Sequence, residues 1–404
     1  MKHVRKIILF ISLIAITPVN AQENPLQYRG FLRSRFYENR IENEYALPGI
    51  EKRNITSTAN VYLKKNFDNF SFVTDIEVNH DHFNNDSRFV FNELFFSYYQ
   101  DNLNLFVGRK LIDWSPGFTW NPSDKINIKK DPTDPVERRK GTNVVGAQYT
   151  LNTFNFTGIT QVDSNDVSFH LKIGKDFEFL NSSLYTFYSR KKSSIGKEEN
   201  YFGLIGKFMI TNELDFYFET MINKNQSTLI PQKTTAPVGD IYFFNNSDDS
   251  RKHHLSALIG LRYTRIKSDF NLMVEYYRNG YGYNKEDRQN FFHFMFQIMV
   301  KQGLSDADLL YKTQFATIGY DNFMKDYLSF SANKTTKSRK FEYMLNFIWS
   351  MNDNSFILTP QIKYILSGKI AFDARFYTFT GSDQTEFGSK PVSNSLMLNM
   401  NYYF

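Results

Sequence analysis

Residues 393 to 404 read SNSLMLNMNYYF, and apolar and polar side chains alternate through most of this segment. Successive side chains of an extended strand point to opposite faces, so one face collects the apolar members Leu396, Leu398, Met400, Tyr402 and Phe404. The other face carries Asn399 and Asn401. The segment therefore predicts a strand with one apolar face and one face that suits water.

Blocks with the same period of two recur along the chain, each about ten residues long. They include residues 29–36, 58–64, 70–79, 167–173, 214–223, 270–277, 340–349 and 370–375. This length fits a tilted strand that crosses a hydrocarbon core, whereas no apolar run of about 18 residues follows the first 21. A soluble β-sandwich also alternates. The aromatic content of 17%, with 41 Phe and 25 Tyr, favours a membrane barrel that turns its rings to lipid.

The connections between these blocks are alternately short and long. Tight polar turns are expected at residues 67–69, 100–102, 151–153, 211–213, 267–269 and 366–368. Long polar stretches lie near residues 38–55, 80–87, 110–141, 191–199, 224–252, 280–289 and 381–393. Short turns at one end and long loops at the other are typical of a single antiparallel transmembrane β-barrel, with the turns on the periplasmic side. We predict about 18 strands, within a range of about 16 to 20, because residues 301–338 fit either one hairpin or two.

The first 21 residues have the pattern of an export signal. Lys2, Arg5 and Lys6 precede a short apolar run from Ile7 to Ile16, and Ala21 ends a small-residue cleavage motif. The predicted barrel domain is therefore residues 22–404. Removing three basic residues leaves 48 − 3 = 45 basic against 42 acidic residues, a net charge of +3, and no nucleic-acid partner is expected. The chain has no cysteine, which excludes disulfides.

Residues 108–141, GRKLIDWSPGFTWNPSDKINIKKDPTDPVERRKG, interrupt the alternation. They hold two of the three tryptophans and four of the eleven prolines. Proline and glycine at this density exclude a regular strand, and a loop of about 30 residues is uncommon unless it is functional or disordered. Its aromatic rings argue for packing. The loop either folds into the barrel and narrows it or lies as a cap over the extracellular rim.

Two features resemble known outer-membrane proteins. The terminal strand that ends on Phe404 is similar to the aromatic-ended strand of Gram-negative outer-membrane barrels. A second resemblance is to a segment of porin-like proteins that include alginate-export-type channels; it is carried by Gly108-Arg109, Trp114, Gly117, Trp120-Asn121-Pro122 and Asp124, then Asp134 and Arg138-Arg139. The resemblance implies recognition of Phe404 by the barrel-assembly machinery and surroundings of outer-membrane lipid and lipopolysaccharide. It also implies passive or substrate-selective diffusion of a small polar solute or saccharide.

Charged side chains on the water-facing sides of the strands and in the loop are candidates for lining a pore. They are Arg29, Arg33, Arg35, Asp75, Glu77, Arg109, Asp113, Asp124, Arg138, Arg139, Lys172, Glu219, Arg262, Glu275 and Arg375. Charged rings bias the ion selectivity of a pore. The basic ladder Arg29, Arg33 and Arg35 on one strand favours a weak anion preference. The alternative is that these charged side chains pair with one another and only keep the lumen hydrated.

Other functions have weaker support in the sequence. A non-conducting barrel that anchors or assembles surface polysaccharide is the main alternative. A lipid-modifying enzyme could use His253, His254 and Ser256, but such pairs arise easily, so we expect no enzyme and no cofactor. His80-Asp81-His82 could hold a metal ion, although a solvated turn is the simpler interpretation. The protein could be a monomer or a homotrimer.

Overall fold

The computed structural model describes residues 25–41, 51–135, 139–163, 166–178, 181–192, 198–224, 228–236, 239–247, 253–302 and 323–404. Residues 1–24 include the predicted export signal, which therefore lies outside the described residues, as do the loop residues 136–138. No helix of the described segments is long and apolar enough to cross a membrane.

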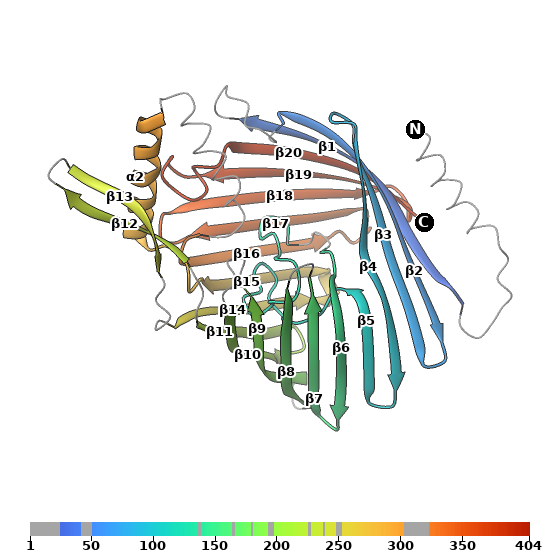
Figure 1. The fold of residues 1–404 in the computed structure, drawn as a ribbon. Helices are drawn as coiled ribbons and strands as arrows, with labels where there is room; N and C mark the ends of the chain where they lie inside the picture. Colours follow the sequence, from blue (N-terminus) through green and yellow to red (C-terminus); the bar gives the residue numbers. More distant parts are fainter. Residues whose placement is uncertain are drawn as a thin grey trace.

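The chain forms a closed antiparallel barrel of 18 strands, which confirms the predicted fold class. The first eleven are β1 (Gln27–Ile41), β2 (Arg53–Phe67), β3 (Phe70–Asp81), β4 (Asp86–Gln100), β5 (Leu103–Lys110), β6 (Thr142–Leu151), β7 (Phe154–Val162), β8 (Val167–Phe177), β9 (Ser182–Lys192), β10 (Glu198–Thr211) and β11 (Leu214–Lys224). The others are β14 (His254–Arg265), β15 (Phe270–Arg278), β16 (Asp326–Thr335), β17 (Phe341–Ser350), β18 (Ser355–Ile365), β19 (Ile370–Thr380) and β20 (Val392–Tyr403). Figure 1 shows them wrapped around a central lumen.

The terminal segment closes the barrel. β20 pairs with β19 on one side and with β1 on the other, and Phe404 exchanges backbone hydrogen bonds with Gly30 at 2.9 and 3.1 Å. A Cβ atom at Gly30 would lie 2.5 Å from the Phe404 ring and 2.4 Å from the carbonyl oxygen of Asn60. A glycine is therefore required where the last ring crosses the first strand. Closure leaves no unpaired edge for lipid to meet.

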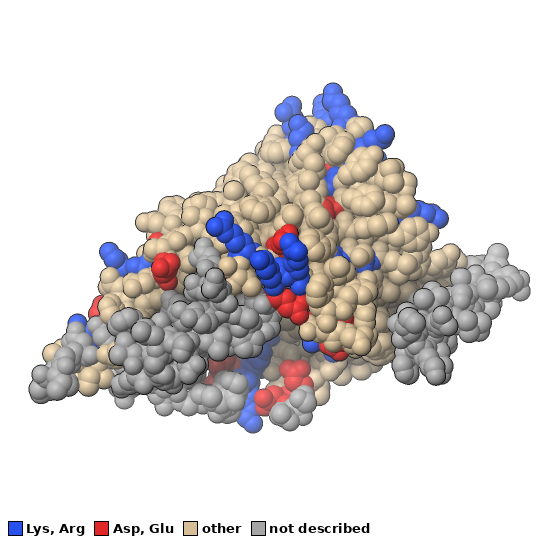
Figure 2. All heavy atoms as spheres, turned by 90° about the horizontal axis from the view of Figure 1, so that it is seen from above, with Lys and Arg blue, Asp and Glu red and all other residues tan. Residues whose placement is uncertain are grey.

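The alternation of the sequence determines which face each side chain takes. Outward positions such as Leu32, Phe96 and Val107 are 50% or more exposed in the isolated barrel, as a lipid-facing surface requires. Inward positions such as Asn60, Ser97 and Asn401 are buried against the lumen contents or neighbouring strands. Seen from above, uncharged atoms make up most of the visible face, and the charged side chains lie in small groups (Figure 2).

The predicted tight turns all join neighbouring barrel strands at one end, where Asp68, Asp101, Asn152 and Asp269 adopt positive φ angles of 41° to 53°. Two of the predicted long loops contain regular secondary structure that the alternation pattern does not predict. Residues 224–252 include a separate hairpin, β12 (Thr228–Ala236) with β13 (Gly239–Ser247). Residues 280–289 run into helix α2 (Lys285–Gln302), which contacts that hairpin (Figure 1). A short 3-10 turn, η2 (Ile266–Ser268), precedes β15.

Candidate functional site: a loop folded into the lumen

The loop between β5 and β6, residues 111–141, lies inside the barrel (Figure 1). Both its ends leave adjacent strands, because Lys110 pairs with Thr142. The loop packs in the lumen and reaches strands far from its own in the barrel, whose side chains hold it in place.

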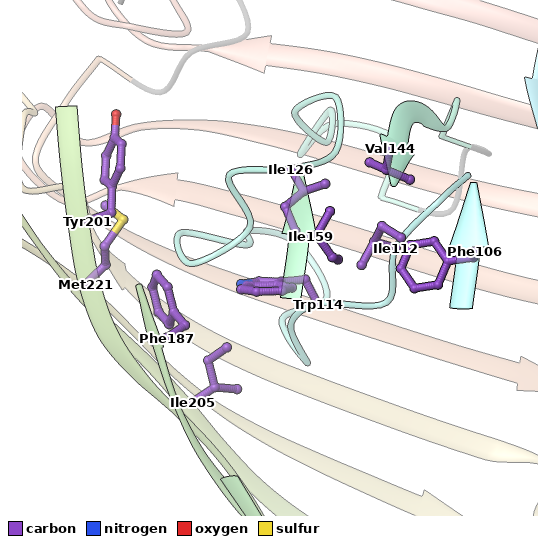
Figure 3. Packing of buried hydrophobic residues seen from close by; sticks show 10 residues of the cluster. All are labelled: Phe106, Ile112, Trp114, Ile126, Val144, Ile159, Phe187, Tyr201, Ile205 and Met221. Carbon is purple, nitrogen blue, oxygen red and sulfur yellow. The ribbon is translucent and has the colours of Figure 1, made fainter. Parts of the chain in front are cut away.

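The first contact is an apolar cluster around Trp114. Ile112, Trp114 and Ile126 of the loop are 2 to 3% exposed and pack against the inner faces of β5, β6, β7, β9, β10 and β11. The wall residues of this cluster are Phe106, Val144, Ile159, Phe187, Tyr201, Ile205 and Met221 (Figure 3). The Trp114 ring meets Phe187 edge-on at 6.2 Å. Apolar burial on this scale fills one side of the lumen and stabilises the docked loop.

The second contact is an aromatic cluster around Trp120. This ring stacks on Tyr277 of β15 at 5.2 Å and lies 5.7 Å from Tyr327 of β16. Leu258, Ile348, Ile357 and Tyr217 complete the wall side. The indole N–H groups of Trp114 and Trp120 have no hydrogen-bond partner among the described residues, so both rings are held by packing.

Around Trp120, wall carboxylates accept hydrogen bonds from the loop backbone. Glu219 of β11 accepts from the backbone N of Gly117 at 2.9 Å and from the backbone N and hydroxyl of Ser123 at 3.2 and 2.6 Å. Glu275 of β15 accepts from the backbone N of Phe118 at 2.6 Å and of Thr119 at 2.7 Å. Both carboxylates are buried. Charge-assisted bonds of this kind are about twice as strong as neutral ones.

Gly117 is required at this contact for steric reasons. A Cβ atom there would lie 1.9 Å from the carbonyl oxygen of Trp120 and 2.9 Å from Glu219 Oε1. Any side chain would therefore force the turn apart or push the carboxylate away. The same turn is fastened by Asn121, whose amide donates to the Gly117 carbonyl at 2.8 Å and to Ser115 Oγ at 2.7 Å.

Further polar contacts fix the two ends of the docked loop. Lys172 of β8 donates to the Trp114 carbonyl at 3.2 Å, and Arg375 of β19 forms an ion pair with Asp134. Within the loop, Arg139 pairs with Asp124 at 2.9 Å. Thr119 and Ser329 of β16 bring their hydroxyl oxygens to 3.0 Å. The loop thus contacts β8, β11, β15, β16 and β19 by named polar bonds.

Two lysines of the loop are half-buried. Lys125 lies 4.9 Å over the Tyr201 ring, and Lys130 donates to the Phe118 carbonyl. Burial lowers the pKa of each to about 8. Partial removal from water disfavours the charged form of each ammonium group.

A second loop, residues 381–391 between β19 and β20, packs on the Trp120 cluster. Phe387 is 4% exposed and belongs to that cluster. Tyr327 donates to Glu386 Oε2 at 2.6 Å, and the Glu386 backbone N donates to Asp353 Oδ2 at 2.7 Å. Burial raises the pKa of Glu386 to about 8. This loop packs on the Trp120 contact from the barrel end opposite the tight turns.

The wall formed by β19, β20 and β1 to β4 carries polar side chains that bond mainly to one another. Arg33 Nε donates to Asn401 Oδ1 at 2.8 Å, and Arg35 Nε donates to Asn399 Oδ1 at 2.9 Å. On β3 and β4, Asp75 Oδ1 accepts from the amides of Asn60 and Asn92 at 2.7 and 3.0 Å. Glu77 accepts from the Asn79 amide at 2.7 Å.

The predicted pore-lining residues therefore fall into distinct groups. Lys172, Glu219, Glu275 and Arg375 contact the loop, as described above. Arg29, 4.4 Å over the Tyr62 ring, joins Arg33, Arg35, Asp75 and Glu77 on the inward face of β1 to β3.

The remaining predicted residues lie elsewhere. Arg109 pairs with Leu94, which is 38% exposed, and shares the outward side of β5 with Val107, so it does not face the lumen. Arg262 is inward and lies 5.7 Å over the Tyr217 ring. Asp113 is an exposed loop residue. Arg138 lies outside the described residues.

Several residues of this site were not predicted from the sequence because they are uncharged. Tyr217 donates to Glu275 Oε1 at 2.7 Å and completes the bonds of that carboxylate, while Ser123, Thr119 and Ser329 add hydroxyls. Tyr217 and Ser329 could have been placed in the lumen from the alternation of their strands, which puts both side chains on the inward face. For the loop residues no periodic signal exists.

The residues weighed for other chemistry form hydrogen bonds with neighbouring groups. His254 contacts the Gly280 carbonyl at 3.1 Å, and Ser256 Oγ accepts from the Gly280 backbone N at 3.0 Å. His80 and His82 meet edge-on at 4.6 Å, and each contacts a serine hydroxyl. Among the residues that the structure describes, no group of three or more metal-ligating side chains occurs.

Comparison with solved structures agrees with this architecture. Acinetobacter baumannii OccAB3 matches with a TM-score of 0.51 and 11% identity, over 94% of this chain and 99% of that chain. Engineered variants of the Rh. blastica porin match with TM-scores of 0.46 and 0.45 at 10% and 11% identity, over 94% of this chain and 100% of theirs. No protein-family profile and no curated protein matches. The OccAB3 likeness and the closed barrel of 18 strands give the chain the fold of a porin-like outer-membrane β-barrel.

Proposed function

We propose that the protein is a diffusion channel of the outer membrane for small polar solutes, with the loop 111–141 as its constriction. Barrels of about 16 to 18 strands are wide enough to leave an aqueous channel, whereas barrels of about eight fill with their own side chains. The observation that carries the proposal is the docking of this loop in the lumen through Glu219 and Glu275.

The conducting path would run between the loop and the wall of β20 and β1 to β3. Arg33, Arg35 and Glu77 are half-buried on that wall, so part of each side chain is accessible from the lumen. Opposed charges along such a path orient polar solutes as they pass. The basic side chains favour a weak preference for anions.

Single-channel recording in planar bilayers tests the proposal. The wild-type protein is expected to open in discrete steps. Deletion of residues 113–135 leaves eight residues, 111–112 and 136–141, between adjacent strand ends and should raise the step size several-fold, because it removes the constriction. Circular dichroism and resistance of the barrel to detergent denaturation serve as folding controls.

The main alternative, a barrel that anchors or assembles surface polysaccharide, predicts another outcome. A folded protein without conductance steps, both with the loop and without it, would contradict the channel proposal and favour the scaffold. Released fatty acid after incubation with lipid would favour the enzyme.

A further inference from the structure

Two histidines lie side by side at the end of β3 that is opposite the tight turns. His80 pairs with Ser57 of β2, and the backbone N of His82 donates one further hydrogen bond to β2 at 3.0 Å. Side chains two residues apart on a strand share a face, and Val78 on this face pairs with Phe89, which is 55% exposed. Both imidazoles therefore lie on the outward face, with ring centroids 4.6 Å apart and ring planes at 84°.

Each imidazole bonds to a serine hydroxyl through one of its two nitrogens. His80 Nδ1 lies 2.9 Å from Ser87 Oγ of β4, and His82 Nε2 lies 2.8 Å from Ser57 Oγ of β2. The other two nitrogens, His80 Nε2 and His82 Nδ1, form no hydrogen bond with the residues that the structure describes. When the bonded nitrogen carries the proton and donates to serine, the free nitrogen presents the lone pair that a metal ion requires. Metal-binding histidines are commonly oriented by such a second hydrogen bond.

The pair is accessible and lies within reach of one metal ion. His82 is exposed and His80 is half-buried. Imidazole nitrogens bind zinc at about 2.0–2.1 Å, so two nitrogens up to about 4 Å apart can share one ion. Ring centroids 4.6 Å apart allow that separation. The carboxylate of the intervening Asp81 accepts hydrogen bonds from the backbone N of Phe83 and of Asn84 at 2.9 and 3.0 Å, which leaves the imidazoles as the available donors.

We propose that His80 and His82 form a surface binding site for a first-row divalent metal ion, with Cu²⁺ preferred and water completing the coordination. Imidazole suits copper, nickel and zinc, and the affinity of a given set of nitrogen ligands is greatest for Cu²⁺. Magnesium and calcium prefer oxygen ligands, so this donor pair selects against them. The site lies on the outward face of the barrel, away from the loop 111–141, and does not rest on the channel function.

Calorimetric titration of the detergent-purified protein, without a histidine tag, with copper(II) chloride tests the site. The wild type should bind Cu²⁺ saturably, and Zn²⁺ more weakly. His82→Ala removes a ligand and should weaken Cu²⁺ binding by more than about tenfold. Ser57→Ala keeps both imidazoles but frees the His82 ring, and should weaken binding about tenfold. His293→Ala serves as the control, because it removes an exposed imidazole of α2 and should leave the affinity unchanged.

Electron paramagnetic resonance of the copper-loaded protein gives a second readout, which a change in protein stability would not alter. The wild-type spectrum should show coupling of Cu²⁺ to two imidazole nitrogens, and the His82→Ala spectrum coupling to one. Three results would overturn the site: no saturable Cu²⁺ binding, equal Cu²⁺ affinity of the wild type and His82→Ala, or binding of Ca²⁺ as tight as that of Cu²⁺. The last result would assign the binding to oxygen ligands instead of the imidazoles.

Discussion

The two sides of the barrel wall present similar inward charges but use them differently. On β11 and β15, Glu219 and Glu275 are covered by the loop 111–141 and accept its backbone N–H groups. On β3, Asp75 and Glu77 accept instead from asparagine amides of the wall itself. An inward carboxylate therefore anchors the loop where the loop packs over it, and bonds within the wall where the loop does not. Its position on the strand alone does not predict which of these roles it has.

This difference assigns separate tasks to the two sides. The side from β5 to β18 holds both tryptophan clusters and carries most of the loop contacts. The side from β19 through β20 to β4 carries the hydrogen-bonded relay of Arg33, Asn401 and Asp373 and borders the proposed path. It meets the loop at Arg375, which pairs with Asp134, and at Glu93, which accepts from the backbone N of Leu111. Changes on the first side should alter whether the loop stays docked, and changes on the second should alter which solutes pass.

The largest effect on docking is expected from Trp120→Ala. Truncating a buried tryptophan costs about 3–5 kcal/mol, which raises the undocked fraction of the loop at least 100-fold. Because the chain has no cysteine, a single Ile126→Cys reporter, buried in the docked loop, can be followed with a water-soluble maleimide. Its labelling rate should rise in the Trp120→Ala background.

Trp349→Ala is the matched control for that experiment. Trp349 follows Ile348 on β17. Because Ile348 is buried on the inward face, the Trp349 side chain lies on the outward face. It should leave labelling of the reporter unchanged. Equal rates in the two tryptophan variants would show that the Trp120 cluster does not hold the loop.

A smaller effect is expected from Glu275→Gln. The glutamine amide keeps one acceptor oxygen, but its NH2 group replaces the other and faces a loop N–H. The lost hydrogen bond should destabilise docking by about 2 kcal/mol, which corresponds to roughly a 30-fold rise in the labelling rate of the Ile126→Cys reporter. Glu342→Gln is the control, because Glu342 is also inward but pairs with Lys363 and is 40% exposed. Surface pairs of that kind contribute about 0–1 kcal/mol. Equal labelling rates for Glu275→Gln and Glu342→Gln would contradict the claim that Glu275 anchors the loop.

The smallest effect is a pH dependence of the loop 381–391. Burial raises the pKa of Glu386 to about 8, so the packed loop keeps this proton while a displaced loop loses it near the ordinary value of about 4.5. Packing is therefore most stable at low pH and weakens as the pH rises toward 8, beyond which the loss levels off. A Ser389→Cys reporter should label several-fold faster at pH 8 than at pH 6, relative to the same reporter with Glu386→Gln. A ratio that stays flat with pH would contradict the buried, protonated carboxyl.

Much of the barrel could be predicted because one simple rule repeats along it. Alternation with a period of two assigned Leu32 to lipid and Arg33 to the lumen, and tight polar turns marked the strand ends correctly. Arg109 follows the same rule, since it shares parity with Leu105 and Val107. Its assignment to the pore came from its place at the loop entrance, which the strand register overrides.

The contacts of the loop could not be predicted from the sequence. Its rings indicated packing, but Trp120 meets Tyr277 and Tyr327 more than 150 residues away, through geometry that exists only after the barrel closes. Helix α2 was missed because Phe291, Phe292 and Phe294 are adjacent or nearly so and leave no clean apolar stripe. The hairpin of β12 and β13 was read as part of a long polar loop.

The central claim is that the loop 111–141 docks inside the barrel against β16, and a disulfide tests it most directly. Thr119 and Ser329 hold their hydroxyl oxygens 3.0 Å apart, so Thr119→Cys with Ser329→Cys should oxidise to a disulfide in the otherwise cysteine-free chain. Thr119→Cys with Ser395→Cys is the control, since β20 lies four strands, about 19 Å, from β16. The account predicts a disulfide in the first pair alone, detected by mass spectrometry; its absence there, or equal formation in both pairs, would contradict a docked loop.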